Sequence, residues 1–146
     1  MTHRKIFDKS KLKENETKFI PLPSDIRHYI HHPKITADMM YLYGLIVDYY
    51  NVNEGYAYPT LYTLEVSYGK VRDTISKHLD VLKDVGLIDF PEKGTYFPLV
   101  PLPENEFFVR YPEANAAYKK ALKRRDEKLV SGRERMQEYR RSKGYA

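Results

Sequence analysis

The residues with the clearest chemistry lie between positions 70 and 77. This stretch carries ammonium, guanidinium and hydroxyl groups that donate hydrogen bonds, on Lys70, Arg72, Thr74, Ser76 and Lys77. Such donors bind phosphate oxygens and the acceptor atoms on the edges of bases. If the stretch begins a helix, the unpaired amides of the first turn also favour an anion there. The pattern therefore predicts the binding of a polyanion.

Two helices joined by a tight turn are expected to position these donors. Thr60 can cap the first helix through its hydroxyl, and Ser67-Tyr68-Gly69 ends it, since glycine accepts the positive φ of a sharp turn. The second helix is predicted from about Lys70 to Val85, and Gly86 ends it as the residue after the C-cap. Its apolar stripe consists of Val71, Ile75, Leu79 and Leu82.

A helix of this kind has a buried side and an outer side. With Ile75 at the centre of the buried side, the outer side holds Lys70, Asp73, Thr74, Lys77 and Asp80, with Arg72 and Ser76 at its edges. The arrangement predicts a helix-turn-helix, whose second helix enters the major groove of DNA. Arg72 is the best candidate for a bidentate guanine contact. The alternative is an amphipathic hairpin with a solvated face.

The same stretch resembles a family of DNA-binding proteins. The resemblance covers about residues 19 to 118 and is carried by Thr63-Leu64, Gly69, Thr74-Ile75, Leu79, Leu82 and Gly86-Leu87-Ile88. These match the winged helix-turn-helix pattern, and the wider frame resembles small replication initiators and regulators of Gram-positive plasmids and phages. The sequence departs from the pattern at Glu65, Val71, Asp73 and Asp80. The resemblance implies a mainly α fold with a small β-hairpin wing.

A hairpin after the second helix is predicted to form that wing. Leu87 to Phe90 and Thr95 to Phe97 are apolar segments around the short loop Pro91-Glu92-Lys93-Gly94. Lys93 at the tip is expected to contact the minor groove or one phosphate, and an uninvolved turn is the alternative. In the winged fold, a short strand at Tyr56 to Tyr58 pairs with the wing.

Charge and composition divide the chain into three parts. The 146 residues carry a net charge of +5, of which residues 1–18 contribute +3, residues 19–110 contribute −4 and residues 111–146 contribute +6. We therefore expect a flexible basic arm (1–18), a winged helix-turn-helix domain (19–110) and a basic C-terminal helix or tail (111–146). The basic ends would contact phosphates and thereby release counterions, which favours binding to DNA. The alternative is that they serve only to keep the chain in solution.

The remaining segments lead to further structural predictions. Ser24 is expected to cap a helix that ends near His31, and Thr36 a helix that ends near Tyr50. The proline-containing segment 98–103 is extended and is expected to press its apolar side chains, Leu99, Val100 and Leu102, on the core.

The C-terminal part holds two candidate contact surfaces. Phe107 and Phe108 are expected either to be buried or to form a docking patch. Pro112 begins a long polar helix. Its seven-residue repeat of Leu122, Leu129 and Met136 allows a homodimer seam, and a solvated basic helix that frays after Val130 is the alternative.

Several classes of protein are not favoured by the sequence. The chain has no cysteine, which excludes disulfides and thiol catalysis and suits the cytoplasm. His28, His31 and His32 are followed at once by Pro33 and lack a completing carboxylate pattern, so no metal site is predicted. No nucleotide-binding or catalytic motif occurs, and no apolar run is long enough to span a membrane. We expect a protein that is not an enzyme and has no cofactor or small-molecule ligand.

Two functions remain. The first is sequence-specific binding of double-stranded DNA through residues 70–77 and Lys93, as a transcription regulator or a plasmid or phage replication or segregation factor. A homodimer on a repeated site is compatible with it. The second is a winged helix that docks proteins without reading a DNA site, which the acidic residues Asp73, Asp80 and Glu65 favour.

Overall fold

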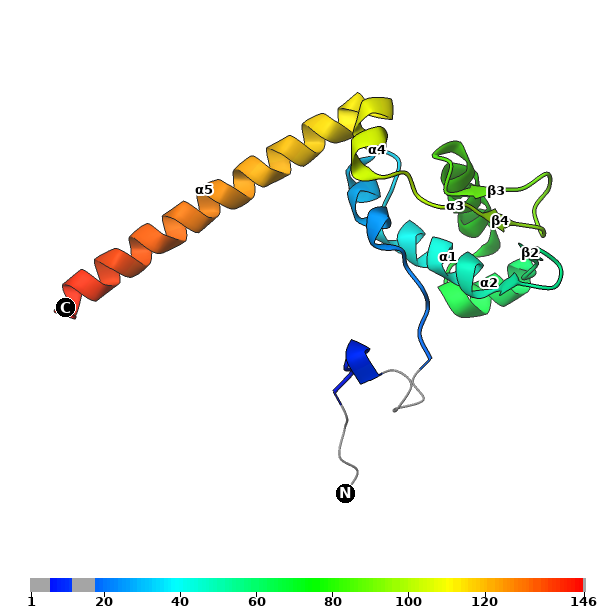
Figure 1. Cartoon of the computed structure of the whole chain (residues 1–146), viewed down its shortest axis with the longest axis horizontal. Helices are drawn as coiled ribbons and strands as arrows, with labels where there is room; N and C mark the ends of the chain where they lie inside the picture. Colours follow the sequence, from blue (N-terminus) through cyan, green and yellow to red (C-terminus); the bar gives the residue numbers. More distant parts are fainter. Residues whose placement is uncertain (1–5, 12–17, 146) are drawn as a thin grey trace, which may run out of the picture.

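The structure is a computed structural model that describes residues 6–11 and 18–145. Residues 19–111 form a globular body, and one long helix projects away from it (Figure 1). The elements are η1 (Lys9–Lys11), η2 (Ser24–His31), α1 (Ala37–Asp48), β1 (Tyr50–Asn51), β2 (Tyr56–Ala57), α2 (Leu61–Tyr68), α3 (Arg72–Asp84), β3 (Ile88–Asp89), β4 (Phe97–Pro98), α4 (Glu104–Arg110) and α5 (Pro112–Ser142). The chain is mainly α with small β-hairpins, as predicted.

Three helices build the centre of the body. α1 contacts both α2 and α3, which also pack on each other. Their meeting surface is aliphatic, and its fully buried members include Leu42, Ile46, Leu64, Ile75, Leu79 and Leu82. Burial of each such side chain contributes on the order of 1.5–3 kcal/mol. The core confirms the predicted stripe of the second helix except at Val71, which is 68% exposed because it precedes the helix.

The N-terminal segment covers the side of α1 opposite to this core. A side-chain carbon added at Gly44 would come within 2.9 Å of Ile20 and Leu22, so the segment lies directly on the helix at this glycine. This confirms that α1 is packed from more than one side. η2 is a 3-10 helix that begins at Ser24, with Pro23 in the cap position, so the prediction of a Ser24 cap is wrong.

The two ends of α1 differ from what the sequence predicted. Thr36 occupies the predicted N-cap position, but its hydroxyl donates to the Asp38 carboxylate and caps no amide. The helix ends at Asp48, before the predicted Tyr50, because Tyr50 and Asn51 form β1. Asn51 then makes the expected turn, and its side-chain oxygen accepts from the amides of Asn53 and Glu54. The strand β1 was missed by the sequence analysis.

The β-structure is a ladder of short antiparallel pairs. β1 pairs with β2, and β3 pairs with β4 in the register Ile88 to Pro98 and Asp89 to Phe97. Ala57 and Tyr96 exchange two backbone hydrogen bonds of 2.8 Å, which connects β2 to the edge of the wing. The strand predicted at 56–58 therefore does pair with the wing hairpin, as in a winged helix-turn-helix. Tyr96 is fully buried beneath this junction.

The extended segment after the wing ties the sheet to the N-terminal half. The Tyr43 hydroxyl donates to the Leu99 carbonyl at 2.8 Å, and the Leu102 amide donates to the Tyr29 hydroxyl at 2.8 Å. The extended conformation was predicted. The side-chain assignment is confirmed for Leu102, which is half-buried against the core, and wrong for Val100, which is 88% exposed, and Leu99, which is 39% exposed. Pro101 is buried instead.

A cluster of rings joins the body to the long helix. Phe107 of α4 is fully buried, 4.3 Å from the Tyr29 ring and 4.8 Å from the His28 ring. Phe108 is half-buried and stacks on Tyr118 of α5 at 4.9 Å. Of the two alternatives predicted, burial is confirmed for Phe107, which belongs to the core. A docking patch made of both phenylalanines is therefore wrong.

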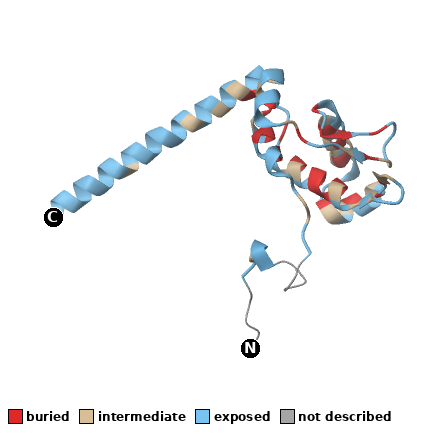
Figure 2. Ribbon diagram, viewed as in Figure 1, coloured by how far each residue is buried: buried red, intermediate tan, exposed pale blue. Residues whose placement is uncertain are grey.

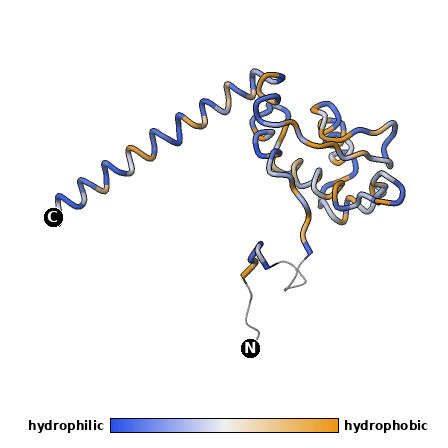
Figure 3. Tube along the Cα trace, in the orientation of Figure 1, coloured by the Kyte–Doolittle hydropathy of each residue, from blue (hydrophilic) through white to orange (hydrophobic). Residues whose placement is uncertain are grey.

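The C-terminal helix α5 leaves the body after its first turns. Pro112 is at its start, as predicted, and Ala114 is fully buried, whereas residues 119–145 are exposed apart from Leu122 and Gly132 (Figure 2). The helix continues through Ser131 and Gly132 to Ser142, so the expected fraying after Val130 is not seen. Apolar residues recur as isolated bands along a hydrophilic rod (Figure 3).

The outer parts of the chain add little to the core. Residues 1–5 and 12–17 of the predicted N-terminal arm lie outside the described residues. Within residues 6–11, η1 is a single turn with no buried side chain. None of the helices in the described ranges has the length and apolar character needed to cross a membrane.

Candidate nucleic-acid interface

The turn between α2 and α3 sets the direction of the candidate interface. The Thr60 hydroxyl accepts from the Thr63 amide at 3.1 Å, which confirms the predicted cap of α2. Gly69 adopts φ 74° and its amide donates to the Glu65 carbonyl at 3.0 Å. The left-handed conformation costs glycine little energy, whereas a residue with a side chain would be disfavoured in it. The chain can therefore turn sharply into α3.

The helix α3 has the amphipathic form that the sequence predicted, with shifted ends. It starts at Arg72, so Lys70 lies in the turn and Val71 is the N-cap. Val71 has no side-chain acceptor, and no side chain caps the first-turn amides. At the other end, the Leu87 and Gly86 amides bond to the Leu82 and Lys83 carbonyls, which is a Schellman ending.

The outer side of α3 is open to solvent. Asp73, Lys77 and Asp80 are exposed, and Thr74 and Ser76 are half-buried at the base of this surface. Within the part of the chain that the structure describes, Lys77 has no hydrogen-bond or ion-pair partner, and neither do the hydroxyls of Thr74 and Ser76. Together with Arg72, these residues form one surface at the amino-terminal half of α3.

Arg72 is held by α2. Its Nε lies 3.2 Å from Glu65 Oε1, and its Nη1 donates to the Tyr62 hydroxyl at 3.0 Å. The guanidinium carbon also lies 4.9 Å from the centre of the Tyr62 ring. Glu65 and Tyr62 thus fix the orientation of the Arg72 guanidinium. Sequence reasoning missed Tyr62, although its spacing from Glu65 of three residues places both on one face of α2.

Two other predicted cations are also paired with acids. Lys70 Nζ lies 3.7 Å from Asp38 of α1. The pKa of Asp38 is lowered, first by the hydrogen bond from Thr36 and to a smaller degree by nearby cations, Lys70 among them. Lys93 does not extend from the tip of the wing: its ammonium group lies 3.2 Å from both carboxylate oxygens of Asp80. The wing lysine therefore folds back on α3.

A polar contact behind α3 braces the two helices. The Tyr68 hydroxyl lies 2.8 Å from His78 Nδ1, and burial raises the pKa of Tyr68. Tyr49 reaches the same side of α2, with its hydroxyl 2.6 Å from Ser67 Oγ. His78 thus has a structural partner on the inner side of α3, away from its solvent-exposed outer side. These bonds fix the angle at which α3 is presented.

The histidines near the N-terminus serve packing. His28 Nε2 bonds to the Leu102 carbonyl at 2.7 Å, and His31 lies 5.1 Å from the Tyr118 ring. His32 packs edge-on against Tyr111 at 4.6 Å. Burial lowers the pKa of both His31 and His32. In the described ranges, no group of three or more His, Cys, Asp or Glu side chains is placed to hold a metal ion.

Known proteins offer few points of comparison. No protein-family model matches the chain, and no curated protein is similar enough to match it. Among solved structures, the chain is similar to "Structure of MDR initiator", with 18% sequence identity and a TM-score of 0.49. The alignment covers 76% of this chain and 98% of the other. The fold assignment therefore rests on the strand pairing and helix packing described above.

Proposed function

We propose that this protein binds double-stranded DNA in a sequence-specific manner, with α3 in the major groove. The observation that carries the proposal is the open outer side of α3, where Arg72, Thr74, Ser76 and Lys77 share one surface. The helix is braced from behind by buried aliphatic side chains and by the Tyr68 to His78 contact, so the surface is presented rigidly. A rigid helix suits direct readout of base edges.

Each residue has a distinct part in this proposal. Arg72, with its planar fork, donates to the N7 and O6 atoms of a guanine, and Glu65 and Tyr62 hold it ready. Thr74 and Ser76 donate to base edges or phosphate, and Lys77 to phosphate. Lys70 and Lys93 reach phosphates only by leaving Asp38 and Asp80. Exposed pairs of this kind are worth at most about 1 kcal/mol, so such exchange is inexpensive.

We expect this binding to serve the regulation of transcription, or the replication or segregation of a plasmid or phage. One winged helix covers few base pairs, so two copies on a repeated site would give a useful binding energy. The chain is proposed to act in the cytoplasm, without a cofactor and without catalysis.

A second candidate is a protein-docking winged helix. The observation that favours it is the pairing of Lys70, Arg72 and Lys93 with acids, which leaves the body with little positive potential. The net charge of −4 on residues 19–110 points the same way. The buried Phe107 does not support it.

Selection of bound duplexes from a random pool separates the two candidates. The DNA proposal predicts enrichment of one motif, and a palindrome or direct repeat would also report two copies on the site. A docking module predicts no enriched motif. Selection without enrichment at low salt contradicts the DNA proposal, since phosphate contacts are strongest under that condition.

Protein variants, measured on the enriched duplex, assign a role to each residue of α3. Arg72→Ala is expected to cost about 1–3 kcal/mol and to relax the preference at one base pair. Arg72→Lys retains the charge but loses the fork, so it should lose the preference while keeping more of the affinity. Lys77→Ala should weaken all sequences alike and reduce the salt slope by about one. Lys34→Ala, an exposed lysine outside α3, is the matched control. Equal effects of Lys34→Ala and Lys77→Ala would contradict the assignment.

A further inference from the structure

Among the residues that the structure describes, no other element covers a long surface of helix α5. It contacts η2 and α4 through its first turns, and its last ring contacts with the body are those of Tyr118. Beyond that residue, positions 119–142 extend for about 36 Å at 1.5 Å per residue. The helix runs away from α3 and the wing (Figure 1), so its distal half is remote from the candidate DNA interface. Whatever binds there binds independently of α3.

One side of this projecting helix is apolar. At 100° per residue, Leu122, Leu129 and Met136 fall on one side in a seven-residue repeat, and Tyr139, three residues after Met136, borders that side. Leu129 is 58% exposed, Met136 66% and Tyr139 53%. A solvated helix has no need of such a repeat, whereas a helix that packs on another helix requires it. We refer to these four residues as the α5 seam.

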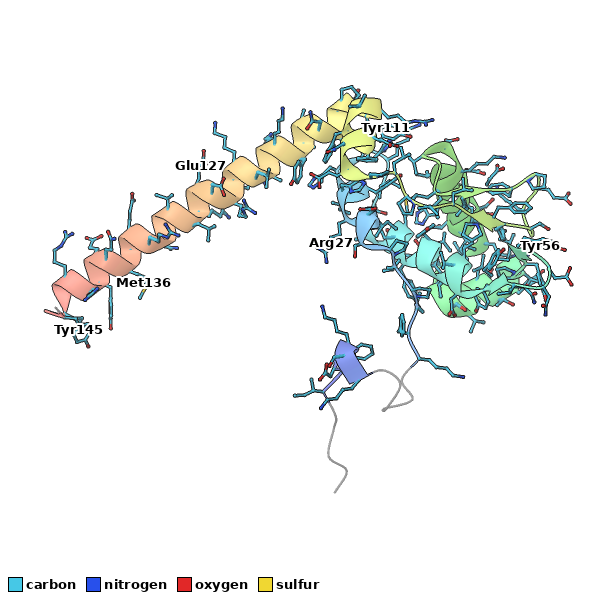
Figure 4. The ribbon with its side chains drawn as sticks, in the orientation of Figure 1. Arg27, Tyr56, Tyr111, Glu127, Met136 and Tyr145 are labelled. Carbon is cyan, nitrogen blue, oxygen red and sulfur yellow. The ribbon has the colours of Figure 1, made fainter. Side chains whose placement is uncertain are left out.

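The borders of the α5 seam are basic, whereas its back carries both signs, with Lys120 and Lys123 among the basic residues there. In the heptad that places Leu122, Leu129 and Met136 at the first position, the flanking positions hold Lys128, Arg133, Arg135 and Arg140. One flanking position holds an acid, Asp126, whose carboxylate lies 3.1 Å from the Arg125 guanidinium. Glu127, Glu134 and Glu138 lie on the far side, and Figure 4 shows Glu127 and Met136 on opposite sides of the helix.

This charge pattern disfavours a second copy of the chain as the partner. In a parallel pair, Lys128 would face Arg133 and Arg135 would face Arg140, and both contacts are repulsive. An antiparallel pair would set Lys128 against Arg135 and gain only Asp126 against Arg133. A seam with basic borders is complementary to a helix with acidic borders. Nucleic acid would satisfy the cations but leave the seam uncovered.

We propose that α5 docks an acidic amphipathic helix of another protein along the α5 seam. Leu122, Leu129 and Met136 pack on the apolar side of that helix. Lys128, Arg133 and Arg135 pair with its Glu or Asp residues. Gly132 leaves a gap in the seam, since an added carbon there would meet only the Arg135 side chain at 4.0 Å. A large side chain of the partner fits into this gap. Arg125 lies on the same side of the helix as the α5 seam, and on docking it exchanges the Asp126 carboxylate for an acid of the partner.

A designed peptide tests this docking with the full chain. The probe is a helical peptide of three heptads with Leu at the seam positions and Glu at the flanking positions, and its control carries Lys at the flanking positions. Calorimetry is expected to detect one bound Glu peptide per chain, with an affinity that falls as salt is raised, and no binding of the Lys peptide. Equal binding of both peptides, or binding of neither, would overturn the proposal.

Matched charge reversals locate the site. The double variant Lys128→Glu, Arg135→Glu is expected to weaken Glu-peptide binding by at least about tenfold. Lys120→Glu, Lys123→Glu makes the same change of charge on the back of α5, and it should alter the affinity by less than about twofold. Circular dichroism of both variants checks that the helix persists. Equal losses would show that net charge, not the seam, attracts the peptide.

Two further outcomes would assign α5 to a different partner. Sedimentation of the chain alone reports its oligomeric state, and a dimer that dissociates on Leu129→Ser would replace the acidic partner with a second copy. Binding of random duplex DNA that is lost in Lys128→Glu, Arg135→Glu, with no binding of the Glu peptide, would assign α5 to nucleic acid. Neither result bears on the motif selected through α3, so this inference and the proposed function fail separately.

Discussion

The body and α5 use positive charge in different ways. In the body, Lys70, Arg72 and Lys93 each pair with an acid from another element, so each pair relates two different segments of the fold. On α5, the pair formed by Arg125 and Asp126 joins neighbours on one helix and relates no two elements. Exposed pairs stabilise a fold by only about 0–1 kcal/mol. Their value in the body is therefore orientation, whereas the pair on α5 orients no second element.

The two regions differ as much in apolar burial. The body encloses a continuous core that reaches from Tyr29 through α1 and α3 to Tyr96. Apart from Ala114 and the half-buried Tyr118 and Leu122, the apolar side chains of α5 are exposed. Because burial is the main source of stability, the body should unfold cooperatively while the distal part of α5 should not contribute. Four experiments test this contrast.

The largest effect is expected at the junction of the two regions. Phe107→Ala removes a fully buried ring in contact with Tyr29, His28 and Tyr111, and should lower the free energy of unfolding by about 3–5 kcal/mol. Val109→Ala, at an 82% exposed position of the same helix, is the control and should cost below about 0.5 kcal/mol. Urea denaturation measures both. Similar losses would mean that α4 is not part of the core.

One type of substitution should have opposite signs in the two regions. Gly69→Ala forces a side chain into the left-handed region, at φ 74°, and should destabilise the body by about 1–2 kcal/mol. No atom lies within 4 Å of the added carbon, so the cost is one of backbone conformation. Gly132→Ala should strengthen α5 by up to about 1 kcal/mol, since glycine is a poor helix former.

The readouts of the glycine pair differ as well. Gly69→Ala should shift the cooperative unfolding transition. Gly132→Ala should raise the helical signal in circular dichroism and leave that transition in place, because the distal part of α5 does not pack on the body. A shift of the transition by Gly132→Ala would show that α5 folds together with the core.

Acidification should loosen the junction without an equal effect on the distal helix. Burial lowers the pKa of His31 and His32 below the ordinary value of 6.5 in the folded chain. Their contribution to stability is therefore complete above about pH 6.5 and is lost as the pH falls through the lowered folded pKa. Hydrogen exchange should show η2 and the first turns of α5 opening sooner at pH 5 than at pH 7.5. His31→Phe, His32→Phe should reduce this difference, and an unchanged difference would contradict the assignment.

The smallest change in stability is expected when the wing is released from α3. Asp80→Asn breaks the pair with Lys93 and should alter the free energy of unfolding by less than about 1 kcal/mol. It also frees a cation beside the proposed DNA surface, so duplex affinity should rise and the salt slope should increase by about one. Glu92→Gln, which removes a neighbouring charge of the same sign without freeing Lys93, is the control. A lower duplex affinity for Asp80→Asn would contradict the proposed role of Lys93.

Features that depend on nearby residues were predicted in part: the caps at Ser24 and Thr36 were wrong, whereas the signals around α2 and α3 were confirmed. Thr60, Gly69 and Gly86 mark the ends of α2 and α3 because a cap or a positive φ is settled within one helical turn. The seven-residue spacing on α5 belongs to the same class. Features that depend on distant residues were missed, among them the exposed Val100, and Asp80 as the partner of Lys93. α4 was not recognised because seven residues give a weak periodic signal.

By itself, the sequence determined the order of η2, α1, α2, α3 and α5, the wing hairpin, the polar outer side of α3 and the basic character of the C-terminal helix. These follow from local capping and from the period of apolar residues, which act over a few positions. Only the tertiary structure decided that Arg72 is held by Tyr62 and Glu65, that Lys93 turns to Asp80, and that Phe107 closes the core. Such contacts join segments whose separation in space is fixed by packing, and packing is a property of the whole body.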